Sequence, residues 1–122
     1  MNEKKFSVQN RLRAVGYAFE GVIYFFKKEH NAWIHAASAF IVLIAAYLVH
    51  VSATELIAIL LAIGLVWVAE IINSSIETIM DHLSPQIHPA VKVVKDLAAA
   101  AVLIAAIIAL LIGFIIFIPK FL

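Results

Sequence analysis

Acidic and amide side chains recur between residues 70 and 81 at spacings that bring them to one face of a helix. At about 100° per residue, Glu77 and Asp81 fall within about 20° of Glu70, and Asn73 and Ser74 flank them. Carboxylate and amide oxygens suit a hard cation such as Mg²⁺, and a carboxylate can act as general base for a hydroxyl group. The face predicts a functional site, although Asn73 and Ser74 also fit hydrogen bonds between helices and Asp81 also fits a solvated position.

Lys95 adds a positive charge that can balance a phosphate group. A base, a magnesium site and a phosphate-binding lysine together describe phosphoryl transfer. The sequence has no GxxxxGK[ST] loop and no protein-kinase signature, which excludes the known soluble nucleotide-binding folds. It also has no cysteine, which excludes a disulfide scaffold, a thiol catalyst and a thiolate metal site.

The composition decides which kind of chain must position these groups. Of the 122 residues, 65% are hydrophobic and 14% are charged, which excludes a water-soluble globule because soluble domains are about half apolar and a quarter charged. The net charge of +1 excludes a nucleic-acid binder that depends on neutralising phosphates. The sequence therefore predicts a small helical membrane protein.

Three apolar runs, 32–51, 56–80 and 97–118, are each long enough to cross a bilayer, which needs roughly 20 residues. The preceding segment, 6–28, carries apolar residues at alternating steps of four and three, which indicates a helix on the membrane surface. A tail helix that packs on a partner is the alternative for this segment. We expect an all-α integral membrane protein with a single domain over 1–122.

The distribution of Lys and Arg predicts the orientation of the chain. Six of the nine precede residue 32, two lie between residues 81 and 96, and one is at position 120, which places the N-terminus in the cytoplasm. Glu70 then lies about 21 Å below the outer surface, and nearly all polar groups fall in the cytoplasmic leaflet. This distribution favours chemistry between a water-soluble reagent and a lipid headgroup over a transport pathway, which needs polar groups through the full thickness.

Two blocks carry a resemblance to a known family. The stretch EIINSSIETIMD at 70–81, followed by KDLAAAAV at 95–102, resembles the prokaryotic diacylglycerol kinases, a family that includes undecaprenol kinases. The likeness extends over nearly the whole chain. It implies a membrane lipid kinase in the inner membrane of a bacterium, a homotrimer with composite sites between subunits, which uses Mg-ATP to phosphorylate a lipid alcohol.

The resemblance also assigns roles to individual residues. Glu70 matches the catalytic base, and Glu29 and Glu77 match the magnesium-binding carboxylates. The positions that match nucleotide-binding residues are Tyr17, Asn73, Gln86, Ile87, His88, Lys95 and Asp96. Asn10 departs from the family pattern, which has an arginine there, so either Arg11 or Arg13 supplies that charge or the contact is lost.

A second set of residues bears on the lipid substrate. The segment NAWIHA at 31–36, the pair His88-Pro89 and the ending Pro119-Lys120 resemble the undecaprenol kinase branch, so undecaprenol is the expected substrate. Diacylglycerol, with phosphatidic acid as product, is the alternative. A membrane subunit or ion pathway without enzymatic activity is a remote alternative. For His35, both a lipid or phosphate contact and a hydrogen bond between helices fit the sequence.

Overall fold

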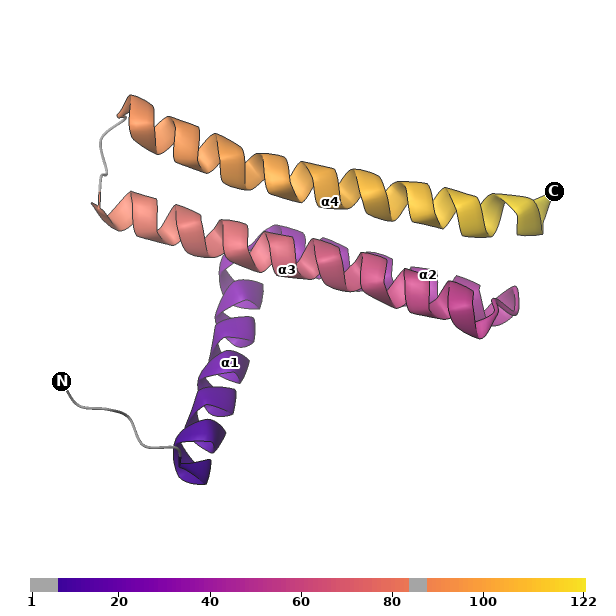
Figure 1. Ribbon diagram of the computed structural model, residues 1–122, viewed down its shortest axis with the longest axis horizontal. Helices are drawn as coiled ribbons and strands as arrows, with labels where there is room; N and C mark the ends of the chain where they lie inside the picture. Colours follow the sequence, from indigo (N-terminus) through magenta and orange to yellow (C-terminus); the bar gives the residue numbers. More distant parts are fainter. Residues whose placement is uncertain (1–6, 84–87) are drawn as a thin grey trace. The chain divides into compact units, whose positions relative to one another are not determined.

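The computed structural model describes residues 7–83 and 88–122, and every regular element in these ranges is an α-helix (Figure 1). The elements are α1 (Val8–Lys28), α2 (His30–Leu48), α3 (Ala53–Leu83) and α4 (Pro89–Phe121). They form two compact units, the first ending at Ile34 and the second comprising His35–Leu122. The predicted all-α class is confirmed.

Helix α1 makes up most of the first unit. Its N-cap is Ser7, whose hydroxyl accepts a hydrogen bond from the backbone N–H of Asn10 at 3.4 Å. Two lysines in the last turn, Lys27 and Lys28, interact favourably with the negative end of the helix dipole. The apolar stripe predicted from the sequence lies on this helix and is exposed, with Leu12 and Phe19 each 68% accessible. An exposed apolar stripe of this kind is what a helix on a membrane surface requires.

The junction between α1 and α2 is fixed by an aromatic pair. The Trp33 indole N–H donates to the Phe26 carbonyl at 3.0 Å, and the two rings meet edge to face with centroids 5.0 Å apart. Between them, Glu29 has an extended backbone (φ −105°, ψ 115°) and ends α1 by donating its N–H to the Phe25 carbonyl. Within the first unit, the aromatic pair thus links the end of α1 to the first turn of α2 on either side of Glu29.

Helices α2, α3 and α4 are each long and apolar enough to cross a membrane. Ala46 of α2, Ile59 of α3 and Ile116 of α4 form a buried cluster, which shows that the three helices meet near one end of the second unit. At 31 and 33 residues, α3 and α4 are about 46 and 50 Å long, whereas the hydrocarbon core is about 30 Å thick. Both helices must therefore extend beyond the hydrocarbon.

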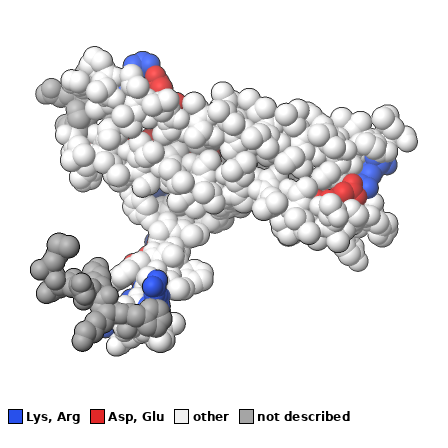
Figure 2. Space-filling model, in the orientation of Figure 1, with Lys and Arg blue, Asp and Glu red and all other residues white. Residues whose placement is uncertain are grey.

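The antiparallel helices α3 and α4 lie side by side along their length (Figure 1) and are joined by an ion pair at each end. Lys95 Nζ lies 2.5 Å from Asp81 Oδ1 at one end, and Lys120 Nζ lies 3.1 Å from Glu55 Oε1 at the other. Figure 2 shows charged side chains near both ends of this pair and an almost uncharged surface between them. This is the distribution that a helix pair across a bilayer requires, because charge is costly in hydrocarbon.

The helices do not coincide with the apolar runs. Helix α2 ends at Leu48, because the left-handed backbone of His50 (φ 56°) turns the chain before the apolar run ends at residue 51. Helix α4 begins at Pro89 rather than residue 97, since proline at the first helical position needs no donor and His88 caps the helix. It also continues through Pro119 to Phe121. Apolarity marks the hydrocarbon, whereas caps and turns mark the helix ends.

The start of α3 generates a prediction. Ser52 and Glu55 form a reciprocal capping box, in which the Glu55 N–H donates to Ser52 Oγ at 3.1 Å and the Ser52 N–H donates to Glu55 Oε1 at 2.9 Å. We expect Ser52→Ala to cost about 1 kcal/mol of local helix stability and to raise hydrogen exchange of the Glu55 amide about fivefold. Thr54→Ala, in the same turn, is the matched control. Equal exchange rates in the two variants would show that the box contributes no stability.

Candidate functional site

Glu70 lies in the second half of α3, beyond the buried Val66, and its side chain is only 15% exposed. Its Oε1 lies 2.9 Å from Nε2 of His35, which α2 places opposite it. Of the two alternatives that the sequence left open for His35, this is the hydrogen bond between helices, although Glu70 was not predicted as its partner. A histidine near the start of the first apolar run is the signal that could have found it, but its partner becomes evident only when α2 and α3 are packed together.

One turn further along α3, Asn73 and Glu77 are joined directly. The Asn73 amide group donates to Glu77 Oε1 at 3.3 Å, and both side chains are half-buried. The Asn73 Oδ1 atom is buried and makes no hydrogen bond within the part of the chain that the structure describes. An unpaired buried acceptor is costly, so this oxygen is available to a ligand or cation.

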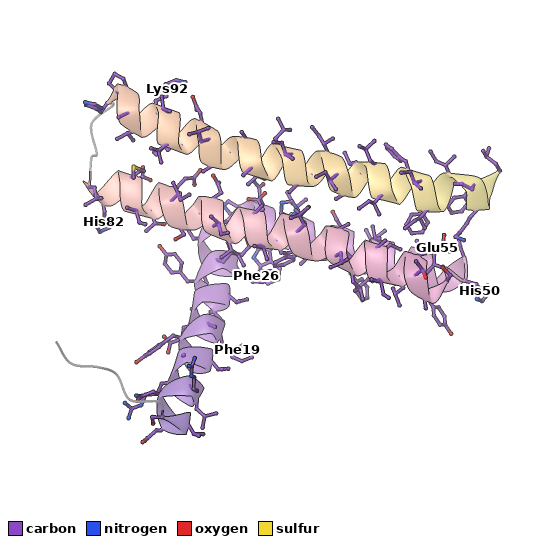
Figure 3. The ribbon with its side chains drawn as sticks, viewed as in Figure 1. Phe19, Phe26, His50, Glu55, His82 and Lys92 are labelled. Atoms are coloured by element: carbon purple, nitrogen blue, oxygen red, sulfur yellow. The ribbon has the colours of Figure 1, made fainter. Side chains whose placement is uncertain are left out.

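Lys95 reaches from α4 back to α3, where its Nζ lies 2.5 Å from Asp81 Oδ1. The neighbouring Asp96 pairs within its own helix, with Lys92 Nζ 2.5 Å from Asp96 Oδ2. Figure 3 labels Lys92 and His82 at this end of the second unit, and Glu55 and His50 at the other end. The end of α3 and the start of α4 therefore carry both positive and negative side chains, namely Asp81, Lys92, Lys95 and Asp96.

The remaining predicted residues lie in three places. His88 caps α4, where its Nδ1 accepts a hydrogen bond from the Ala90 N–H at 3.1 Å. Tyr17 and Glu29 belong to the first unit, where Tyr17 is exposed on α1 and Glu29 follows its last turn. Gln86 and Ile87 lie outside the described residues. The structure thus joins Asn73 to Glu77 within α3 and Lys95 of α4 to Asp81 of α3, whereas Glu70 pairs with α2 and both Asp96 and His88 pair within α4. Tyr17 and Glu29 are described within their own unit.

Comparison with known proteins bears on this arrangement. The profile of the family described as prokaryotic diacylglycerol kinase matches residues 16–117, which is most of the chain. The chain belongs to the prokaryotic diacylglycerol kinase family. The predicted recognition is thereby confirmed, and with it the expectation that this protein is a membrane-bound lipid kinase.

Individual members of the family show where the chain lies within it. It is 42% identical over 94 residues to an undecaprenol kinase from Bacillus subtilis, with 77% of this chain and 76% of the relative covered. It is 35% identical over 114 residues to a diacylglycerol kinase from Synechocystis, covering 93% of this chain but 65% of that longer relative. A diacylglycerol kinase from Escherichia coli K12 is 29% identical over 82% of each chain. Both kinds of lipid kinase are thus among its relatives.

Whether the site suits a divalent cation can be judged from its donor atoms. No cluster of three or more His, Cys, Asp or Glu side chains close enough to hold a metal ion occurs among residues 7–83 and 88–122. Mg²⁺ does not require such a cluster, because it is usually bound through one or two carboxylates together with phosphate oxygens and water. The Glu77 carboxylate and the unpaired Asn73 Oδ1 are oxygen donors of the right kind. These residues fit the cation that the family implies.

Proposed function

We propose that this protein is an ATP-dependent kinase that phosphorylates the hydroxyl group of a membrane lipid alcohol at the cytoplasmic interface, with undecaprenol preferred. The observation that carries the proposal is Glu70, a largely buried carboxylate on a helix long and apolar enough to cross the membrane. A carboxylate is expensive in such a place, and interhelical hydrogen bonding alone would not require one. Membership of a family of lipid kinases supports the same reading.

In the proposed reaction, Glu70 accepts the proton of the lipid hydroxyl. The lipid oxygen forms a bond to the γ-phosphorus of ATP while the bond from that phosphorus to the β–γ bridging oxygen breaks. The products are the lipid phosphate, ADP and the proton held on Glu70. The membrane confines the lipid and orients its hydroxyl at the depth of the carboxylate, so a small protein can reach the reactive geometry without a deep pocket.

The nucleotide is proposed to lie near the ends of α3 and α4, at Asn73, Lys95 and Asp96. By the family resemblance, Tyr17, Gln86, Ile87 and His88 are proposed as further nucleotide-binding residues. Lys95 is paired with the exposed carboxylate of Asp81, and a salt bridge between such groups is weak. The charge of a triphosphate can therefore compete for Lys95. Asp96 likewise forms an exposed salt bridge, with Lys92 one turn earlier in α4.

Magnesium is proposed to bind with the nucleotide at Glu77, and the family resemblance also proposes Glu29 as a magnesium-binding carboxylate. When bound, Mg²⁺ neutralises charge that develops on the transferred phosphoryl group. The Glu77 carboxylate accepts a hydrogen bond from the Asn73 amide group, which restricts the rotation of both side chains.

The choice of undecaprenol rests on relatives and on sequence. Identity to the relative named undecaprenol kinase is 42%, against 35% and 29% for two named diacylglycerol kinases. The segment NAWIHA at 31–36 points to the same branch. Diacylglycerol, whose primary hydroxyl lies at a similar depth, is the second candidate substrate.

We place the protein in the inner membrane of a bacterium, with a cytoplasmic N-terminus, as a homotrimer. Two of its lysines, Lys92 and Lys95, lie at one end of the second unit, which supports this end as the cytoplasmic one. Many alanines of α4, such as Ala99 and Ala101, are exposed, and small exposed residues allow close packing between membrane helices.

Glu70→Gln tests the role of the base. Because general-base catalysis contributes about 10²–10⁴-fold, we expect phosphate transfer from labelled Mg-ATP in mixed micelles to fall at least about a hundredfold. Glu55→Gln, at the opposite end of α3, is the matched control and should retain activity within twofold. Undecaprenol and diacylglycerol are offered in parallel, and faster labelling of undecaprenol is expected. Near-full activity of Glu70→Gln would show that the base is elsewhere.

Lys95→Met tests the phosphate contact. Loss of a charged hydrogen-bond donor to a phosphate should raise the KM for ATP more than about tenfold, while the KM for the lipid stays within twofold. Lys92→Met removes a similar charge one turn earlier on α4 and should change the KM for ATP much less. Equal effects of the two substitutions would indicate a general electrostatic attraction instead of a specific contact.

Glu77→Gln tests the cation site. We expect the free Mg²⁺ concentration for half-maximal activity to rise about tenfold or more at saturating ATP, because a neutral amide is a weaker ligand for Mg²⁺ than a carboxylate. Glu20→Gln, an exposed carboxylate on α1, is the control. An unchanged Mg²⁺ requirement in Glu77→Gln would remove this residue from the site.

A further inference from the structure

The contact between His35 and Glu70 is the closest polar link between α2 and the proposed catalytic carboxylate. Nε2 of His35 lies 2.9 Å from Glu70 Oε1, and the two side chains are 28% and 15% exposed. The two residues are 35 positions apart in sequence and lie on different helices, so helix packing brings them together. At this distance and burial the hydrogen bond is short and little exposed to competing water.

The chemistry of the two groups fixes the direction of this hydrogen bond if Glu70 is a base. An ionised carboxylate only accepts, so the imidazole must carry its proton on Nε2 and donate it to Oε1. Oε2 is then the oxygen left to accept the proton of the lipid hydroxyl. A glutamate side chain has three rotatable bonds, and the hydrogen bond at Oε1 restricts the directions in which Oε2 can point.

The surroundings of His35 add a second observation. His35 lines a cavity of about 440 Å³ between α2, α3 and α4, whose other lining residues are apolar apart from Ser38 and the indole of Trp67. The contact of His35 with Glu70 therefore lies beside a largely apolar cavity. Ala46 of α2 and Ile59 of α3 also meet further along these helices, in the buried cluster.

We infer that His35 is a positioning residue for the reaction, which orients the Glu70 carboxylate by donating from Nε2 to Oε1. This inference rests on the proposed function of Glu70 as general base. It assigns to α2 a part in catalysis that the sequence motifs on α3 and α4 do not contain. Loss of the donor would leave Glu70 present but free to rotate, so turnover would fall while ATP binding would be retained.

The test compares His35→Leu, His35→Gln and the control Ser38→Ala in the full chain, with kcat and both KM values measured in mixed micelles. A misplacement of about 1 Å can reduce turnover about a hundredfold, so His35→Leu should lower kcat roughly ten- to a hundredfold with the KM for ATP within twofold. The glutamine amide nitrogen can take the place of imidazole Nε2, so His35→Gln should restore kcat to within about fivefold of the parent chain. Ser38→Ala should stay within twofold.

A spectroscopic measurement is independent of turnover. In the chain labelled with ¹⁵N-histidine, the His35 resonances are those absent from His35→Gln, and they should report a proton on Nε2. Glu70→Leu should remove this preference for one tautomer. A bare Nε2 in the parent chain would overturn the inference, even if His35→Leu failed to fold.

The kinetic outcomes separate this inference from the proposed function. An active parent chain with His35→Leu within twofold of it, or with His35→Gln no better than His35→Leu, would overturn the role of His35 alone. A parent chain that phosphorylates neither lipid would overturn the proposed function and this inference together.

Discussion

Hydrocarbon offers no partner to a polar group, and this constraint governs the second unit of the protein. A charged side chain there must reach an end of its helix or find a partner on a neighbouring one. Lys120 and Glu55 meet at one end of α3 and α4, and Lys95 and Asp81 meet at the other. Glu70 is the exception in position, since it lies part-way along α3, and it meets the same requirement through His35 of α2.

The same constraint explains how a chain of 122 residues can hold a reactive site. Helices α3 and α4 are longer than the hydrocarbon core is thick, so their polar ends remain in water while their apolar middle segments lie in the hydrocarbon. In the proposed reaction, a water-soluble nucleotide binds at the helix ends and the lipid hydroxyl lies at the depth of Glu70. Asn73 Oδ1, which is buried and makes no hydrogen bond within residues 7–83 and 88–122, lies between Glu70 and the end of α3, so a ligand there would satisfy it.

The order of polar groups along α3 also suggests why its residues recur at their particular spacing. Glu70 pairs with His35 of α2, and Asn73 pairs with Glu77 within α3. Asp81 pairs with Lys95 of α4. A change of one position would rotate a carboxylate by about 100°, away from its partner. The spacing of the segment 70–81 thus meets the needs of three different contacts, and only some of its residues take part in the proposed chemistry.

Much about this protein follows from the sequence alone: helices by their apolar length, the polar face of α3 by its period, and the family by the blocks at 70–81 and 95–102. These are properties of single segments, and a segment carries its own periodicity. Partners belong to pairs of segments, so the contacts of His35 with Glu70 and of Lys95 with Asp81 came from the tertiary structure. The helix ends also came from the tertiary structure. Helix α2 ends within an apolar run, where His50 turns the chain, and α4 begins before an apolar run, where His88 caps it. Hydropathy reports where hydrocarbon can surround a chain, whereas packing decides which polar atoms meet inside it.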